Sequence, residues 1–279
     1  MRSAILNNAD NSGAYQVESV RKSLEILCSF TPATPRWTLS GLSRALSIPK
    51  STALNLLRTL QSFDFIRQDG ADRSYLIGPR AHELGVLFAS NSDLVNLARP
   101  MMTQLREATQ ETVKLGILTN GEVLVVAAME STLQLHTRGD VGRRWPLHSS
   151  AMGKALLASL SSVELEAWLA THELPRLTPT TIATPEQVMA AVNEIRTRGF
   201  SLDLEENEAG VRCIAANIVD PLKGLHASLS MSAPSVRLTP ELMAERARQV
   251  VETAKQIQTA LRGGARSGLR VVQPVRRPR

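Results

Sequence analysis

The chain has 279 residues, of which 43% are hydrophobic and 21% are charged, and its formal net charge at pH 7 is +6. This composition is typical of a globular protein with one large domain or two ordinary ones. No apolar run reaches the roughly 18 residues that a transmembrane helix needs, and the first residues lack a signal-peptide core. The two cysteines, Cys28 and Cys213, match no metal-ligand spacing, so free thiols and a cytoplasmic location are expected.

Positive charge is concentrated at the C-terminal end of the chain. Residues 1–90 carry a net charge of +3 and residues 91–261 a net charge of −3, whereas residues 262–279 contain six arginines and no acidic residue. This basic tail is expected to be disordered, and it either attracts nucleic acid without sequence preference or is simply solvated. Charge alone therefore gives the N-terminal third only modest support as a nucleic-acid-binding segment.

The N-terminal third predicts three helices followed by a β-hairpin. Apolar residues repeat at helical spacing in residues 17–30, a short helix follows in residues 38–46, and Pro49 suits the first turn of a third helix. Two short strands, Phe65–Gln68 and Tyr75–Ile77, flank an Asp-Gly-Ala-Asp turn. This order is that of a winged helix-turn-helix over residues 17–78. The apolar residues expected on the inner helix faces are Val20, Leu24, Leu27, Phe30, Leu39, Leu42, Leu46, Ala53, Leu56, Leu57 and Leu60.

The third helix has a polar face that suits contact with DNA. In a helix-turn-helix, the second helix of the motif enters the major groove with its N-terminal residues toward the base edges. Asn55 can pair with adenine, Lys50 or Arg58 can reach phosphate or guanine, and Arg73 of the hairpin can reach the minor groove or the phosphates. For an isolated helix, side chains that merely face solvent would be the preferred interpretation. The candidate DNA-binding residues are Lys50, Ser51, Thr52, Asn55, Arg58, Thr59 and Arg73.

The rest of the chain predicts linker helices in residues 79–110 and a separate domain in residues 111–261. Helical and strand patterns mix there without a regular βαβ alternation, which favours an α+β sheet domain. An Asn-Gly pair within residues 112–129 predicts a hairpin turn, and a further strand is expected within residues 131–139. Helices are expected in residues 148–160, 161–170, 184–198 and 239–263, and strands in residues 200–204, 212–219 and 225–232.

Several long segments, in order and spacing, resemble the IclR-type family of bacterial transcriptional regulators across about residues 17 to 261. They include "LSIPKSTALNLLRTL", "ETVKLGIL", "VGRRWPLHSSAMGKALLA" and "IRTRGFSLDLEENEAGVRCIAANI". The resemblance implies a winged helix-turn-helix joined by a linker helix to a GAF-like effector-binding domain. It also implies homodimers or homotetramers that bind a palindromic operator in double-stranded DNA under control of a small molecule, with no cofactor. Leu54 and Asn55 depart from the family's usual residues, which leaves the operator sequence open.

The resemblance also implies where an effector would bind. The backbone amides of Ala151 and Met152 would lie at a helix start, which suits a carboxylate, so a small or aromatic organic acid is expected. An ionised Asp203 would repel that carboxylate, so Asp203 is either protonated or accepts from an effector hydroxyl. The alternative is that Cys213 is a small buried hydrophobic residue and that Ser230 and Ser232 are ordinary residues of a strand. The implied effector-binding residues are Ala151, Met152, Asp203, Cys213, Ser230 and Ser232, with Trp145 and Leu147 as further walls.

Two other classes of protein remain as alternatives. An enzyme could use Cys213, His148 and Asp203 as nucleophile, base and orienting group. The sequence has no G-x-S-x-G elbow, no glycine-rich phosphate loop and no histidine spacing for a metal, so no catalytic residue or metal is expected. A sensor that has lost DNA binding is disfavoured by the polar third helix and by the basic hairpin residues Arg67 and Arg73.

Overall fold

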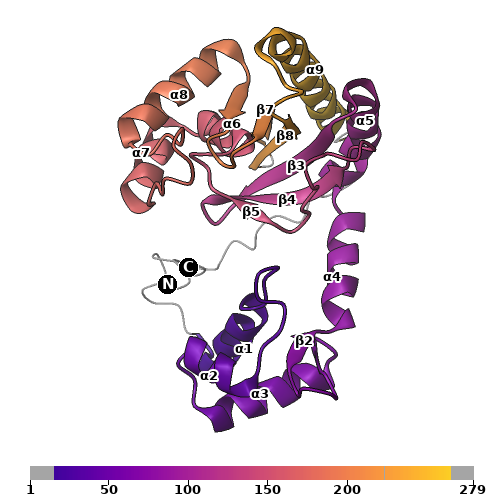
Figure 1. Ribbon diagram of the computed structural model, residues 1–279, viewed down its shortest axis with the longest axis vertical. Coiled ribbons are helices and arrows are strands. Elements are labelled where there is room, and N and C mark those ends of the chain that lie inside the picture. Colours follow the sequence, from indigo (N-terminus) through magenta and orange to yellow (C-terminus); the bar gives the residue numbers. More distant parts are fainter. Residues whose placement is uncertain (1–15, 223, 265–279) are drawn as a thin grey trace. The chain divides into compact units, whose positions relative to one another are not determined.

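The computed structural model describes residues 16–222 and 224–264. The chain forms two compact units that divide between Asn91 and Ser92 (Figure 1). Each unit has its own hydrophobic core, as expected for domains that can fold independently. Within the described residues, no helix is both long enough and apolar enough to cross a membrane.

The N-terminal unit has the order of a winged helix-turn-helix. Its elements are α1 (Glu18–Cys28), α2 (Leu39–Ala45), α3 (Lys50–Ser62), β1 (Ile66–Gln68), β2 (Tyr75–Ile77) and α4 (Pro79–Ser90). The two strands pair antiparallel, with Gln68 opposite Tyr75. The side chains buried between the helices and this hairpin are Ile26, Leu42, Ile48, Ala53, Leu57, Leu60, Ile66 and Tyr75. The order of elements inferred from the sequence is therefore confirmed.

The buried face of α1 differs from the expected one. Val20 and Leu24 are predicted to face the core, but these side chains are 54% and 56% exposed. Ile26 is the fully buried residue of α1, and two of the four predicted residues, Leu27 and Phe30, do pack against the core. Apolar residues repeat at helical spacing on two overlapping faces of this helix, so periodicity alone does not select between them.

The C-terminal unit is built on one antiparallel sheet. In the described residues its strands are β3 (Thr112–Thr119), β4 (Glu122–Met129), β5 (Arg144–Trp145), β6 (Ser201–Leu204), β7 (Val211–Asp220) and β8 (Leu225–Pro234), in the order β5-β4-β3-β8-β7-β6. Helices α5 (Asp93–Thr109) and α9 (Pro240–Gly264) cover one face (Figure 1). The other face is covered by α6 (Ala151–Ser159), with α7 (Ser162–Thr171) and α8 (Pro185–Arg198). This is the α+β architecture that the sequence predicts.

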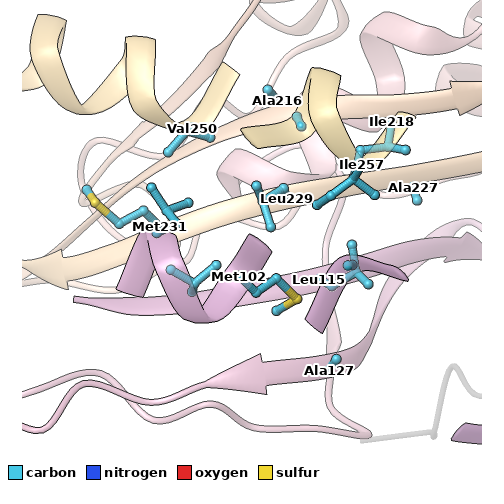
Figure 2. Packing of buried hydrophobic residues seen from close by; sticks show 14 of the residues in the cluster. Met102, Leu115, Ala127, Ala216, Ile218, Ala227, Leu229, Met231, Val250 and Ile257 are labelled. Carbon is cyan, nitrogen blue, oxygen red and sulfur yellow. The ribbon is translucent and has the colours of Figure 1, made fainter. Parts of the chain in front are cut away.

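An apolar layer joins the sheet to α5 and α9. Figure 2 shows Met102 of α5 and Ile257 of α9 packed with Leu115 of β3 and Leu229 of β8, and all four side chains are fully shielded from solvent. Side chains alternate between the two faces of a strand. The even-numbered residues of β3 and β8, such as Lys114, therefore face the α6 side of the sheet, and there the surface becomes polar.

Short-range signals in this unit are confirmed by the structure. Ser161 and Glu164 form the expected capping box, in which the Ser161 hydroxyl accepts from the Glu164 amide and the Glu164 carboxylate accepts from the Ser161 amide. Thr184 caps α8 through the amide of Gln187. Asn120 and Gly121 turn between β3 and β4 with φ values of 52° and 74°, the left-handed pair that a two-residue hairpin turn requires.

The strand predicted within residues 131–139 is wrong. These residues form a loop without a ladder, and the sheet gains the two-residue strand β5 further along. Side-chain bonds hold the loop instead: the Thr112 hydroxyl donates to the Thr137 carbonyl at 2.6 Å, and the Thr137 hydroxyl donates to the Ser232 carbonyl at 3.1 Å. Bonds of this kind replace a backbone ladder without leaving a local sequence pattern.

The stretch expected to hold the linker helices, residues 79–110, contains a connecting helix and then the first helix of the second domain. The α5 side chains that lie in the core under the sheet are Leu94, Val95, Ala98, Met102 and Leu105. The C-terminal unit therefore begins with α5, and α4 is the last helix of the N-terminal unit. At the other end, α9 continues to Gly264, and residues 265–279 of the basic tail lie outside the described residues.

Candidate functional site

The polar face of α3 is available for contact along its whole length. Lys50, Ser51, Asn55, Arg58 and Thr59 are exposed, and Thr52 is half-buried. The rear of the helix is anchored by Ala53, Leu57 and Leu60 in the core. In the described part of the chain, the side chains of Lys50, Asn55 and Arg58 form no hydrogen bond or ion pair, so they are free to bind a partner. The Thr59 hydroxyl is partly occupied, because it donates to the Asn55 carbonyl at 3.0 Å.

The start of α3 differs slightly from the expectation. Pro49 is the N-cap residue rather than a first-turn residue, because its ψ of 140° is extended. Its carbonyl accepts the first helical hydrogen bond, from the amide of Ala53 at 2.9 Å. Lys50 and Ser51 therefore occupy the first turn of α3, whose backbone amides attract phosphate.

The tip of the hairpin is ordered by its own acidic residues. The Asp69 carboxylate accepts from the Ala71 amide at 3.0 Å and from Arg36 at 2.8 Å, and both bonds lower the pKa of Asp69. Arg36 also lies 3.7 Å from Asp72, so one guanidinium offsets the two carboxylates that would otherwise repel a phosphate backbone. Arg73 is exposed and adopts a left-handed φ of 58°. The tip can therefore present Arg73 toward DNA.

A cavity of about 310 Å³ lies on the α6 side of the C-terminal sheet. All six residues to which the resemblance assigned an effector role line this cavity, together with Trp145. Leu147, which was expected to be a further wall, does not line it and packs in the core beneath α6. The residues that the sequence analysis proposed and the structure brings together are Ala151, Met152, Asp203, Cys213, Ser230 and Ser232.

Strand register explains how residues distant in sequence reach one wall. Thr112 of β3 is opposite Ser232 of β8, Ser232 is opposite Cys213 of β7, and Cys213 is opposite Asp203 of β6. Within this row the Cys213 thiol donates to the Ser232 hydroxyl at 3.2 Å. In the next row, Lys114 is opposite Ser230. The sheet side of the cavity is therefore formed by Ser232, Cys213 and Asp203 from the first row and by Lys114 and Ser230 from the second.

The N-terminus of α6 forms another part of the cavity wall. The Ser150 hydroxyl caps α6 by accepting from the Gly153 amide at 3.0 Å. Among the described residues, the amides of Ala151 and Met152 have no hydrogen-bond partner. Free amides at a helix N-terminus favour an anion.

Asp203 is buried at one end of the first row of sheet residues. Its carboxyl is 2% exposed and accepts from the amides of Glu206 at 2.8 Å and Asn207 at 3.2 Å. Burial raises the pKa of Asp203 to about 7, against the opposing effect of the Lys154 ammonium. Lys154 itself forms a buried ion pair with Glu206. A carboxyl with this pKa exchanges its proton near neutral pH, so both sequence-based alternatives for Asp203, the protonated acid and the acceptor, are accessible.

The raised pKa of Asp203 predicts a pH-dependent stability. The folded chain holds a proton that the unfolded chain releases between about pH 4 and about pH 7, so the free energy of unfolding falls as pH rises through this window, by up to about 4 kcal/mol. Asp203→Asn keeps the accepting oxygen and removes this dependence. Urea unfolding of both proteins at about pH 5 and about pH 8 measures the difference. The same pH dependence in both proteins would contradict the assignment.

The triad considered for an enzyme is not assembled. His148 is 1% exposed, does not line the cavity, and bonds through Nε2 to the Pro175 carbonyl at 3.0 Å. Burial lowers the pKa of His148 and raises the pKa of the Cys213 thiol to about 12, which keeps Cys213 a thiol rather than a nucleophilic thiolate. Within the described residues, no group of three His, Cys, Asp or Glu side chains is arranged to hold a metal ion.

Sequence reasoning missed several residues of the cavity. Lys114 is a wall residue from β3, and Arg138, Asp140 and Arg143 come from the loop and turn before β5. Lys114 had a usable signal, because it is the single charged residue in an otherwise apolar and polar-neutral strand, "TVKLGILT". Strand alternation places it on the face opposite Val113 and therefore on the α6 side.

Two models of one protein family match this chain. The family model described as "Bacterial transcriptional regulator IclR C-terminal" matches residues 86–259, and the IclR helix-turn-helix domain matches residues 19–70. The chain belongs to the IclR family. It is therefore a DNA-binding transcriptional regulator with a C-terminal effector domain, not an enzyme.

Individual IclR-family proteins agree with this assignment. The HTH-type transcriptional regulator XynR of Escherichia coli (strain K12) is 32% identical over 245 residues, which cover 88% of this chain and 97% of XynR. The crystal structure of the Thermotoga maritima IclR is 26% identical, with a TM-score of 0.68, and covers 87% of this chain and 98% of that one. An IclR homolog from Microbacterium hydrocarbonoxydans, complexed with 4-hydroxybenzoate, is 24% identical and shares the fold with a TM-score of 0.76, covering 88% of this chain and 99% of that one.

Proposed function

We propose that this regulator binds a palindromic operator in double-stranded DNA and that a small organic acid, bound in the C-terminal cavity, changes its affinity for that DNA. In this proposal the protein acts in the cytoplasm as a homodimer or homotetramer. The observation that carries the proposal is the convergence of six polar contacts from distant segments on one cavity, in a chain whose α3 presents unpaired DNA-binding groups.

The N-terminal unit supports the DNA part of the proposal. Lys50, Asn55 and Arg58 lie on the exposed face of the second helix of the motif, where base and phosphate contacts are made in helix-turn-helix proteins. Arg67 and Arg73 on the hairpin add positive charge. Two copies related by a two-fold axis would place paired helices about one helical turn of DNA apart, or a multiple of it, which matches a palindromic site.

The cavity supports a small acid as the effector. Its volume of about 310 Å³ suits a molecule of modest size. The free amides of Ala151 and Met152 suit a carboxylate, whereas Asp203 and the two serines suit hydroxyl groups. The Microbacterium relative is complexed with 4-hydroxybenzoate, which carries both groups, and this ligand fits the proposed class of effector.

The DNA-binding part of the proposal is tested with the DNA that lies upstream of the gene encoding this protein, called the upstream DNA below. We expect full-length protein to shift this fragment in a mobility assay and to bind an unrelated fragment of equal length at least about 1,000-fold more weakly. The affinity should fall by about 10³-fold or more between about 50 mM and about 200 mM salt, since several phosphates are neutralised. A flat salt response, or equal affinity for both fragments, would contradict sequence-specific DNA binding.

The effector part is tested separately by thermal unfolding. A panel of small aliphatic and aromatic carboxylates is added to the full-length protein, because a ligand that binds the native state raises its unfolding temperature. Acids that raise this temperature should also change the affinity for the upstream DNA. Binding without any change in DNA affinity would contradict the regulatory role.

A further inference from the structure

Lys114 is a buried cation in the wall of the cavity. It is 7% exposed, its neighbours Val113 and Leu115 point into the apolar layer on the other face of the sheet, and it lies opposite Ser230 on the cavity side. Its ammonium nitrogen is 5.8 Å from the centre of the Trp145 ring. The Lys114 side chain therefore ends at the cavity, against an aromatic wall rather than in open water.

In the described residues Lys114 forms no ion pair, although the carboxylates of Asp203 and Glu208 line the same cavity. Among the described residues, no ion pair or hydrogen bond includes the Lys114 ammonium. The other buried lysine of this unit, Lys154, is paired with Glu206. Arg143, which also lines the cavity, is paired with Asp140 at 3.1 Å and stacks on Trp145 at 3.9 Å. A buried charge is unfavourable unless it is paired, so the environment of Lys114 calls for an anion that enters the cavity.

The rest of the wall limits the shape of that anion. The start of α6 crosses several strands of the sheet. The Met152 sulfur lies close to Gly116 of β3, whereas the Ala151 carbonyl accepts from the Ser201 hydroxyl of β6 at 2.6 Å. Asp203 is on β6, which β8 and β7 separate from β3. Neighbouring strands are about 4.8 Å apart, so the backbone positions of Lys114 and Asp203 are separated by roughly 14 Å. Hydroxyl and thiol groups occupy the interval.

We propose that Lys114 determines effector specificity by binding the carboxylate of a small hydroxycarboxylic acid whose hydroxyl group reaches toward Asp203. This inference rests on the proposed function, since it concerns the same cavity. The Lys114 ammonium binds the anionic end, and Asp203 accepts a hydrogen bond from the hydroxyl end. A neutral amide of the same shape leaves Lys114 buried without a counter-charge and is rejected.

The test compares acids with their neutral amides. Calorimetry on the full-length wild-type protein uses 4-hydroxybenzoate against 4-hydroxybenzamide and 4-hydroxybutanoate against 4-hydroxybutanamide. We expect at least one acid to bind, about 30-fold or more tightly than its amide. Lys114→Met should lower the affinity for that acid by about 30-fold or more and change the affinity for its amide by less than about threefold. The ratio of the two affinities, called the acid-to-amide ratio, should therefore fall to near one. Lys114→Arg should keep the preference for the acid, because the charge is kept.

A matched control and a fold check accompany these variants. Lys255 is exposed on α9, so Lys255→Met removes the same charge away from the cavity and should leave the ratio unchanged. Binding of the upstream DNA without acid reports that each variant is folded. If Lys114→Met does not fold, Lys114→Gln, which keeps a hydrogen-bond donor, provides the same comparison.

The outcomes separate this inference from the proposed function. If the wild-type protein binds an acid and Lys114→Met keeps the same acid-to-amide ratio, the role of Lys114 is overturned and the regulator with an acid effector stands. If acid and amide bind the wild-type protein equally, charge selection is overturned as well. If neither acid binds, the hydroxycarboxylic class is overturned, and the carboxylate panel decides independently whether the protein senses an acid at all.

Discussion

The double substitution Asn55→Ala/Arg58→Ala is expected to lower the affinity for the upstream DNA on the order of 10²–10⁴-fold, since each base-edge contact contributes about 1–3 kcal/mol. Both side chains are exposed on α3 and have no partner within the described chain, so folding should not suffer. Fluorescence anisotropy with labelled upstream DNA measures the affinity, and thermal unfolding verifies the fold.

The control for this pair separates base recognition from general charge. Lys255→Ala removes one positive charge from α9 in the other unit and should change the DNA affinity by less than about threefold at moderate salt. If the double variant lost affinity for the upstream DNA and for unrelated DNA by the same factor, Asn55 and Arg58 would contact phosphates and not bases. Unchanged affinity of the double variant would refute α3 as the recognition helix.

Gly153→Ala is expected to destabilise the C-terminal unit by about 3 kcal/mol. A Cβ atom at this position would lie 2.4 Å from Leu147 Cα and 2.6 Å from the Pro146 carbonyl oxygen. These are backbone atoms and cannot rotate away. The start of α6 would therefore shift away from the Pro146–Leu147 backbone, and the Ala151 and Met152 amides would shift with it. The unfolding temperature of this unit should fall by about 6–12 °C, and acid binding should weaken.

Gly85→Ala is the matched control, because it is also a glycine within a helix. A Cβ atom at Gly85 of α4 meets nothing within 4 Å. Alanine is the better helix former by about 1 kcal/mol, so this variant should be slightly more stable than the wild-type protein. If both variants behaved alike in differential scanning calorimetry, close backbone approach at Gly153 would not be the cause of its sensitivity.

The elements of both units were predictable where the signal is local. The winged helix-turn-helix follows from helical spacing around Leu42 and Leu57 and from the short hairpin, and caps such as Thr184 mark helix ends in the sequence itself. The inner face of α1 was not predictable, because Val20 and Leu24 fit a helical stripe as well as Ile26 does. Only packing against α2 and α3 decides which stripe is buried.

The candidate site was predicted in part, and for a different reason. Ala151, Asp203, Cys213 and the two serines came from the family resemblance, since nothing local in their segments indicates a common cavity. Their convergence depends on strand register across β8, β7 and β6, which is a long-range property. Lys114 escaped notice because a lysine in a strand is usually solvated, and its burial depends on the loop before β5.

The strand order has a consequence for self-association. Both outer strands of the C-terminal sheet are short: β5 has two residues and β6 has four, whereas each inner strand has eight or ten. Short outer strands offer few unpaired backbone groups to a second chain. The short length of β5 and β6 therefore disfavours continuation of the sheet through these two strands, and with it edge-to-edge aggregation of the folded protein.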